Sequence, residues 1–195
     1  MDMKKEGEPS MKLAKNAIDV GIYTNKRQEQ LDFWQQEEGL PFEELLKVGG
    51  GVHQLRHDLN GSIFKLNNVR DTLVSGNTGY DELLIAKANL SEPVALTDPD
   101  GNKVKLVPQG WKGVEQIGMV LRVSDIKTFR QFYSDILQID QVAENQFQWG
   151  ATQFFLEQAQ VKPQGSQMGV AAGFQYLTVQ VWQVDDEHQS FLDRG

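Results

Sequence analysis

Two segments of this sequence repeat one pattern, an alternating strand followed by an amphipathic helix. Asp19-Val-Gly-Ile-Tyr-Thr leads to the aromatic pair Phe33-Trp34, and Gly118-Met-Val-Leu-Arg-Val leads to Phe132-Tyr133, 99 residues further on. A chain that repeats a strand-helix unit is built from duplicated modules, and the sheets of such modules face one another. We therefore expect a pocket shared between two sheets, and we expect function there.

Composition and charge narrow the classes of molecule that this protein is expected to bind. The chain has 195 residues, 39% hydrophobic and 24% charged, as in a soluble globular protein. Its formal net charge of -8, without a long Lys/Arg run, argues against nucleic-acid and anionic-membrane partners. It contains no cysteine, which excludes disulfides, thiolate metal sites and cysteine nucleophiles. No segment approaches the roughly 18 apolar residues of a membrane span, and we expect a cytoplasmic protein with a small-molecule ligand.

A β-hairpin is the clearest local structure. Residues 52–59 alternate in character, Asn60-Gly61 forms a two-residue turn, and residues 62–66 return. This turn pairs Leu59 with Ser62 and places one set of side chains on a common face. That set is His53, Leu55, His57, Leu59, Ser62, Phe64 and Leu66. We expect this more apolar face, with its two imidazoles, to line the pocket.

The remaining elements complete two units. Residues 1–16 are expected to form a disordered lead-in, residues 17–109 a first unit with a reduced second half, and residues 113–195 a second, truncated unit. Helices are expected over residues 28–38, after Ser124 or Asp125, and over residues 185–192. Glu43-Glu44 is expected on a solvated helix or loop. Further strands are expected at residues 83–87, 93–97, 103–107, 140–143, 147–149, 152–157 and 174–182, with a loop at residues 161–172.

The last helix bears on the length of the protein. The first unit ends in a hairpin whose turn is Asp98-Pro-Asp-Gly-Asn102, and no counterpart of this turn follows the helix at residues 185–192. We therefore expect the chain to be a piece of a longer protein with an unpaired sheet edge and poor solubility. A soluble product of this length that unfolds cooperatively would count against that expectation.

The order and spacing of these motifs resemble the vicinal oxygen chelate superfamily. The strand openings Val-Gly-Ile-Tyr and Leu-Arg-Val-Ser-Asp, the aromatic pairs in the helices and the Asp-Pro-Asp-Gly-Asn turn carry the resemblance, which covers residues 17–195. That superfamily includes glyoxalase I, extradiol dioxygenases, and bleomycin and fosfomycin resistance proteins. The resemblance implies an α+β fold of tandem βαβββ modules, here with an incomplete C-terminal module.

The resemblance also implies a site for a divalent metal, which members of the superfamily commonly bind with His and Glu side chains from the strands. The first-strand His position is taken by Asp19, Gly118 and Tyr176 in the three copies, and Lys105 stands where the family often has Glu. Only Glu157 matches an expected carboxylate. Glycine has no ligand atom and an ammonium group repels a cation, so the usual site cannot form in its standard shape. The cofactor is therefore left open, and Glu157 is the one metal ligand that the resemblance supplies.

Three residues are candidates for catalysis. His53 and His57 can transfer protons near neutral pH or bind a metal, and Asp19 can act as a replaced ligand or general base if it is buried near His57. The structural alternatives are hydrogen-bonded sheet histidines and an aspartate that caps or solvates a strand start.

Four residues are candidates for ligand binding. Asn60 and Ser62 can present an amide and a hydroxyl, Phe64 shares the face of His57, and Lys105 can attract a carboxylate. The structural alternatives are that Asn60 serves the hairpin turn and that Lys105 is an exposed strand lysine.

Two functions from different classes are consistent with this sequence, as is a third possibility, a structural remnant without a ligand. The first is a glyoxalase- or dioxygenase-like protein that binds a small oxygenated organic molecule and acts as a lyase, isomerase or dioxygenase. The second is a metal-free protein that sequesters a small molecule, as the bleomycin resistance proteins are thought to do. Because one fold hosts many functions, the resemblance does not decide between them. It also allows a homodimer, because family members often complete pockets across subunits.

Overall fold

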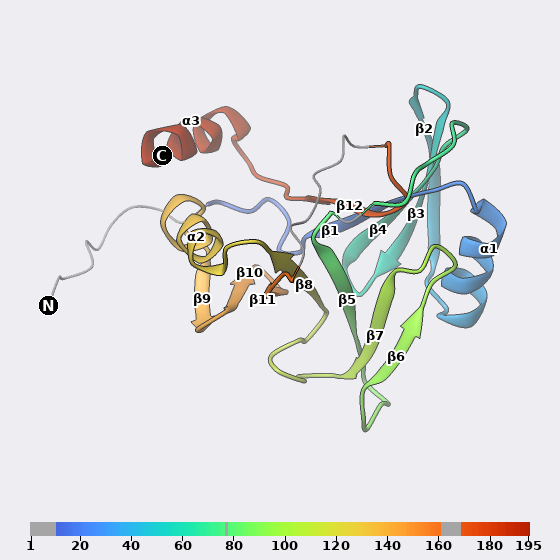
Figure 1. Cartoon of the computed structure of the whole chain (residues 1–195), viewed down its shortest axis with the longest axis horizontal. Helices are drawn as coiled ribbons and strands as arrows, with labels where there is room; N and C mark the ends of the chain where they lie inside the picture. Colours follow the sequence, from blue (N-terminus) through green and yellow to red (C-terminus); the bar gives the residue numbers. More distant parts are fainter. Residues whose placement is uncertain (1–10, 77, 161–168) are drawn as a thin grey trace, which may run out of the picture.

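The computed structural model describes residues 11–76, 78–160 and 169–195 and arranges them mainly as two mixed β-sheets (Figure 1). The five-stranded sheet has the order β12-β1-β4-β3-β2 and consists of β1 (Asp19–Thr24), β2 (Phe42–Gly49), β3 (Val52–Leu59), β4 (Ser62–Asn68) and β12 (Gly173–Thr178). The seven-stranded sheet has the order β6-β7-β5-β8-β11-β10-β9 and consists of β5 (Tyr80–Lys87), β6 (Val94–Thr97), β7 (Lys103–Pro108), β8 (Ile117–Val123), β9 (Asp140–Ala143), β10 (Gln146–Trp149) and β11 (Thr152–Gln158). The expected α+β class is confirmed.

The repeated strand-helix unit is confirmed in detail. After β1, helix α1 (Arg27–Leu31) passes directly into a π-helix, η1 (Asp32–Glu37); after β8, helix α2 (Ile126–Gln131) passes into a second π-helix, η2 (Phe132–Ile136). Both aromatic pairs lie at this transition to the wider helix. The two copies therefore share a local irregularity as well as an order of elements.

The hairpin of β3 and β4 has the predicted register. Leu59 pairs with Ser62, His57 with Phe64 and Leu55 with Leu66. Asn60 and Gly61 both have positive φ angles, 53° and 88°, which the two-residue turn requires.

A strand that the sequence analysis misses lies beside this hairpin. Glu43-Glu44, expected on a helix or loop, belongs to β2, which pairs antiparallel with β3. The register shifts between Phe42 and Glu44 and again between Lys47 and Gly49. Such bulges insert extra residues and break the two-residue alternation, so the sequence pattern does not show a strand here.

Each sheet contains strands from both predicted units. β12 pairs antiparallel with β1, and β8 pairs antiparallel with β5. Residues 17–109 and 113–195 therefore build each sheet jointly, and β12 forms one edge of the five-stranded sheet.

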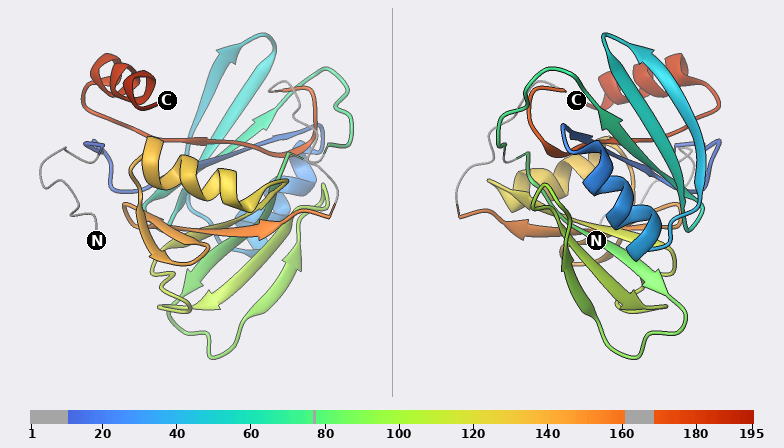
Figure 2. Two further views of the ribbon diagram at one scale, coloured as in Figure 1. Left: turned by 60° about the vertical axis from the view of Figure 1, so that its left-hand side comes forward. Right: turned by 90° about the vertical axis from the view of Figure 1, so that its right-hand side faces the viewer.

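One large hydrophobic core joins the two sheets. Trp34 of η1 is fully buried, with its ring centroid 4.2 Å from that of Phe64 in β4, and its indole N–H donates to Gln30 Oε1 at 2.7 Å. Gln30 in turn donates to Asp98, in the turn between β6 and β7, at 3.1 Å. Figure 2 shows α1 between the five-stranded sheet and the β6–β7 hairpin. One side of the five-stranded sheet is thus covered by helix and core, whereas no helix packs on its other side in the part of the chain that the structure describes.

Residues near the two ends of the described chain lie together. The N–H of Ala14 donates to the carbonyl oxygen of Gln180 at 2.8 Å, and α3 (Val184–Arg194) follows this contact. Of the expected lead-in, residues 1–10 lie outside the described residues, as do residues 161–168 of the expected loop. None of the helices that the structure describes has both the length and the apolar character needed to cross a membrane.

Candidate functional site

The five-stranded sheet has two faces of opposite character. The helix-covered face carries the apolar side chains of β1, β3 and β4 and packs on η1. Because side chains alternate along a strand, the intervening residues point the other way. They form the polar face, which includes Asp19, Gly21, Tyr23, Gln54, Arg56, Asp58, Ile63, Lys65, Asn67, Tyr176 and Thr178.

A buried carboxylate lies on the polar face. Asp19 Oδ2 is 3.0 Å from Lys65 Nζ, and its Oδ1 is 2.7 Å from Lys15 Nζ. The N–H of Ile63 donates to Oδ1 at 2.9 Å, and Gln180 Nε2 donates to Oδ2 at 3.4 Å. Burial acts to raise the pKa of Asp19, but these hydrogen bonds and the Lys65 charge outweigh it and hold the pKa below its ordinary value. The Asp19 carboxylate is therefore ionised, and both of its oxygens have hydrogen-bond or ion-pair partners.

A hydrogen-bonded chain of side chains crosses the same face. Arg56 Nε donates to Gln54 Oε1 at 2.8 Å, and Gln54 Nε2 donates to Asn67 Oδ1 at 2.9 Å. The Tyr176 hydroxyl oxygen then accepts from Asn67 Nδ2 at 3.0 Å and from Gln54 Nε2 at 3.3 Å. This chain of hydrogen bonds links β3, β4 and β12, so both predicted units contribute to it.

Gly21 makes this arrangement possible. A Cβ atom at this position would overlap the Tyr176 ring, which lies directly over the Gly21 backbone. The ring also meets Tyr23 edge to face, with centroids 6.1 Å apart. Burial raises the pKa of Tyr176, although the hydrogen bond from Asn67 opposes this, so the hydroxyl keeps its proton at neutral pH.

Several sequence-predicted site residues lie on the helix-covered face, away from the polar face. His57 is fully buried, 2.9 Å from Gln35 Nε2, and its ring contacts those of Phe42 and Phe64. Ser62 and Phe64 are also fully buried. The expectation that this face lines a pocket is wrong for these three residues, because the more apolar side of the sheet packs against η1.

The two imidazoles and Asp19 are not brought together. His53 lies near the start of β3, half-buried and paired with Asn68, two positions before Leu55 on the helix-covered face. Asp19 projects from the opposite side of the sheet. A role for Asp19 as a general base depends on its burial near His57; Asp19 is buried, but on the opposite face of the sheet from His57.

The other predicted residues lie between the sheets or on the seven-stranded sheet. Asn60 Nδ2 donates to the carbonyl oxygens of Ala86 and Gln116 at 2.9 and 3.0 Å, which fastens the hairpin turn to the neighbouring sheet. Lys105 Nζ is 2.6 Å from Glu82 Oε2. Glu157 has a side chain that is 54% exposed and lies 3.6 Å from Arg122 Nε. These three residues contact parts of the chain outside the polar face.

Sequence reasoning missed Gln54, Arg56, Lys65 and Asn67. A usable signal was present, because these residues alternate with the apolar positions of the same hairpin. The alternation was correctly recognised, but function was assigned to the apolar side of the sheet.

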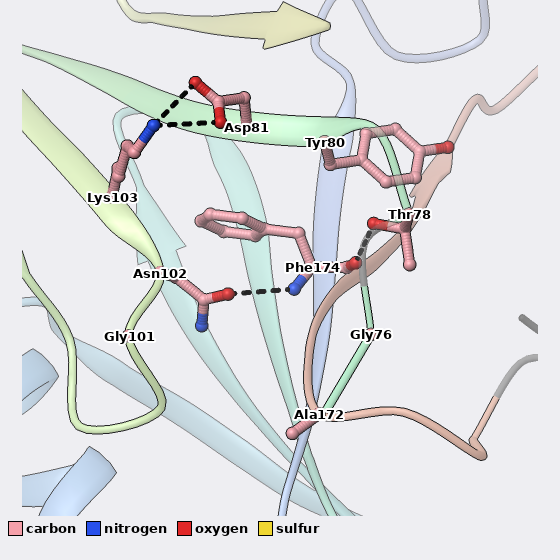
Figure 3. A pocket seen from close by; sticks show the side chains of 9 residues that line it. All are labelled: Gly76, Thr78, Tyr80, Asp81, Gly101, Asn102, Lys103, Ala172 and Phe174. Atoms are coloured by element: carbon pink, nitrogen blue, oxygen red, sulfur yellow. Dashed lines mark hydrogen bonds and ion pairs between the residues drawn. The ribbon is translucent and has the colours of Figure 1, made fainter. Parts of the chain in front are cut away.

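A separate pocket of about 160 Å³ lies near the starts of β5, β7 and β12 (Figure 3). Its polar groups are largely paired with one another: Lys103 Nζ donates to Asp81 at 3.0 Å, Thr78 Oγ1 donates to the carbonyl oxygen of Phe174 at 2.7 Å, and Asn102 Oδ1 accepts from the Phe174 N–H at 3.3 Å. None of the sequence-predicted site residues lines it.

Comparisons with solved structures identify the fold. Glyoxalase I from Zea mays superposes with a TM-score of 0.69 at 11% identity, covering 90% of this chain and 78% of that one. The chain has the vicinal oxygen chelate fold. The CppA protein from Streptococcus pneumoniae TIGR4, at 16% identity, gives a TM-score of 0.58 and covers 93% of this chain and 88% of that one. No protein-family model matches the sequence, and no curated protein matches it.

The vicinal oxygen chelate fold implies a divalent metal, which the donor atoms here do not fit. On the polar face, two ammonium groups already neutralise Asp19, and the Tyr176 ring covers Gly21. On the other sheet, Gly118 has no ligand atom, and Lys105 and Arg122 place positive charge beside the carboxylates. The described residues contain no cluster of three or more His, Cys, Asp or Glu side chains able to hold a metal ion.

Proposed function

We propose that the protein binds a small oxygenated organic molecule on the polar face of the five-stranded sheet, without a divalent metal. The observation that carries this proposal is the buried, interlocked set of polar side chains on a sheet face that no helix covers in the described part of the chain. Burying Asp19, Lys65 and Asn67 costs free energy, and this cost motivates the proposal that the groups serve specificity or function.

Lyase, isomerase or dioxygenase activity is the alternative, supported by the fold shared with glyoxalase I. Proton transfer was expected of His57, His53 or Asp19. His57 is enclosed beneath η1, and all acceptor positions of Asp19 are engaged. Binding therefore fits this arrangement better than acid-base chemistry by these residues. Homodimerisation stays a prediction from the family resemblance.

Amide chemical shifts of the ¹⁵N-labelled protein test the proposal. Catechol, pyruvate and benzoate are titrated separately in the presence of EDTA. We expect at least one of them to shift the amides of Gly21, Lys65 and Tyr176. Shifts confined to the pocket beside Asp81, no shifts at all, or binding that requires added Mn²⁺ would each overturn the proposal.

A further inference from the structure

The centre of the polar face contains a row of hydrogen-bond donors. Tyr176 pairs with Gly21 across β12 and β1, Gly21 with Lys65 across β1 and β4, and Lys65 with Arg56 across β4 and β3. Because directly paired residues point to the same side of a sheet, these side chains lie in one line. We call Tyr176, Lys65 and Arg56 the donor row.

The hydroxyl proton of Tyr176 has no acceptor among the described residues. The oxygen accepts two N–H bonds, from Gln54 and Asn67, which fills both of its lone pairs. Neither amide can be turned to accept the proton instead. Arg56 Nε fixes Gln54 Oε1 in place, and the Ile22 carbonyl oxygen accepts from Asn67 Nδ2 at 2.8 Å.

The two cations of the donor row also keep uncommitted N–H groups. The Lys65 ammonium has three hydrogens and one described acceptor, Asp19, while only 9% of its side chain is exposed. The Arg56 guanidinium has five N–H groups, and those with described acceptors point to Gln54 and Glu44. Buried donors without acceptors are costly, and Lys65 is the buried member of the row, so a ligand that supplies acceptors is favoured beside it.

The acceptors of Asp19, Asn67 and Gln54, which lie beside the donor row, already receive hydrogen bonds. A carboxylate offers about four lone-pair positions, and Asp19 receives four donors. Asn67 Oδ1 accepts from Gln54 and Gln54 Oε1 accepts from Arg56. Asp58, at the far end of β3, lies outside the donor row, and its Oδ1 accepts from the Gly61 N–H within its own turn.

We infer that the ligand of the polar face presents acceptor oxygens, as a carboxylate, carbonyl or phenolate does, and that Tyr176 donates its hydroxyl proton to one of them. This inference rests on the proposed function and names the chemical class of the ligand. A cationic or donor-only molecule finds unfilled donors and no free acceptor in the donor row, so the site discriminates against it.

Three probes of similar size test the inference: benzoate, a charged acceptor; acetophenone, a neutral acceptor; and benzamidine, a cationic donor. We expect benzoate or acetophenone to shift the amides of Gly21, Lys65 and Tyr176, and benzamidine to leave them unchanged. Tyr176→Phe keeps the ring over Gly21 and should weaken binding of the acceptor probe by about three- to tenfold, the effect of one hydrogen bond. Tyr80→Phe, a tyrosine outside the polar face, is the matched control and should bind normally.

The outcomes separate the inference from the proposed function. Benzamidine binding at the polar face as tightly as benzoate would overturn the inference and leave the binding site in place. Unchanged affinity of Tyr176→Phe for the acceptor probe would also overturn it. If catechol, pyruvate and benzoate all leave the polar-face amides unshifted, the proposed function fails and the inference fails with it.

Discussion

Lys65 and Asp19 form an ion pair across the parallel strands β4 and β1, with Nζ and Oδ2 3.0 Å apart and both side chains at least nine-tenths buried. A second cation, Lys15, contacts the other carboxylate oxygen. Asp81 has a comparable pair of partners, Lys103 and Arg122, nearer the solvent. The protein therefore contains two carboxylates that each contact two cations, Asp19 in a buried position and Asp81 in a more exposed one.

Lys65→Met should lower the free energy of unfolding by about 3 kcal/mol, because it leaves a buried carboxylate with one fewer partner. Lys103→Met is the matched control, since Asp81 likewise keeps a second cation and the Lys103 side chain is 48% exposed. It should cost less than about 1 kcal/mol. Urea denaturation measures both, and equal losses in the two variants would contradict a buried role for Lys65.

The stability of the protein should fall as the pH decreases below about 6.5, the ordinary pKa of histidine. Burial lowers the pKa of His57 in the folded state and outweighs the opposing effect of the neighbouring Phe64 backbone. Below pH 6.5 the unfolded chain therefore binds more protons than the folded chain, so stability decreases with falling pH until the folded-state pKa is passed. One proton contributes at most about 1.4 kcal/mol per pH unit.

His57→Phe should remove this contribution to the pH dependence, while His53→Gln, on the same strand, should keep it. The measurement is the urea midpoint between pH 7.5 and 5. An unaltered pH profile in His57→Phe would show that another group is responsible.

Gly21→Ala should displace Tyr176, because the added Cβ overlaps its ring. We expect a loss of about 1 to 3 kcal/mol and altered side-chain amide signals of Gln54 and Asn67 in NMR spectra. Gly118→Ala is the control in the other copy, where the added Cβ would lie 3.2 Å from its nearest neighbours. It should leave those amide signals in place. Unmoved signals in Gly21→Ala would argue against the position of Tyr176.

Trp34→Ala should cost about 3 to 5 kcal/mol, because it empties the fully buried space between η1 and Phe64. Trp182 is 74% exposed, and Trp182→Ala should stay within about 0.5 kcal/mol of the parent protein. Thermal unfolding of both variants checks the prediction. Similar losses in the two would show that the core has been wrongly located.

Much of the fold could be predicted from local patterns. Asn60-Gly61 fixed the register of β3 and β4 because a two-residue turn determines which residues pair. The repeated aromatic pairs correctly indicated the duplication. β2 could not be recognised, because two bulges remove the alternation that identifies a strand.

The site was harder to predict than the fold. The alternation of the hairpin places His57 and Phe64 on one face of the sheet and Arg56 and Lys65 on the other. It does not show which face packs against a helix. That depends on where η1 packs, a tertiary relationship. Tyr176 was noticed only as a residue in place of a histidine, because its partners Gln54 and Asn67 lie more than 100 positions earlier.

The pairing of β12 with β1 also governs when the binding face can exist. During synthesis, Gly21, Lys65 and Arg56 emerge early, but Tyr176 follows more than 100 residues later, and contacts so distant in sequence form slowly. Ligand recognition by the donor row is therefore delayed until the ribosome has released β12, and a nascent chain lacking that strand holds only a half-assembled site.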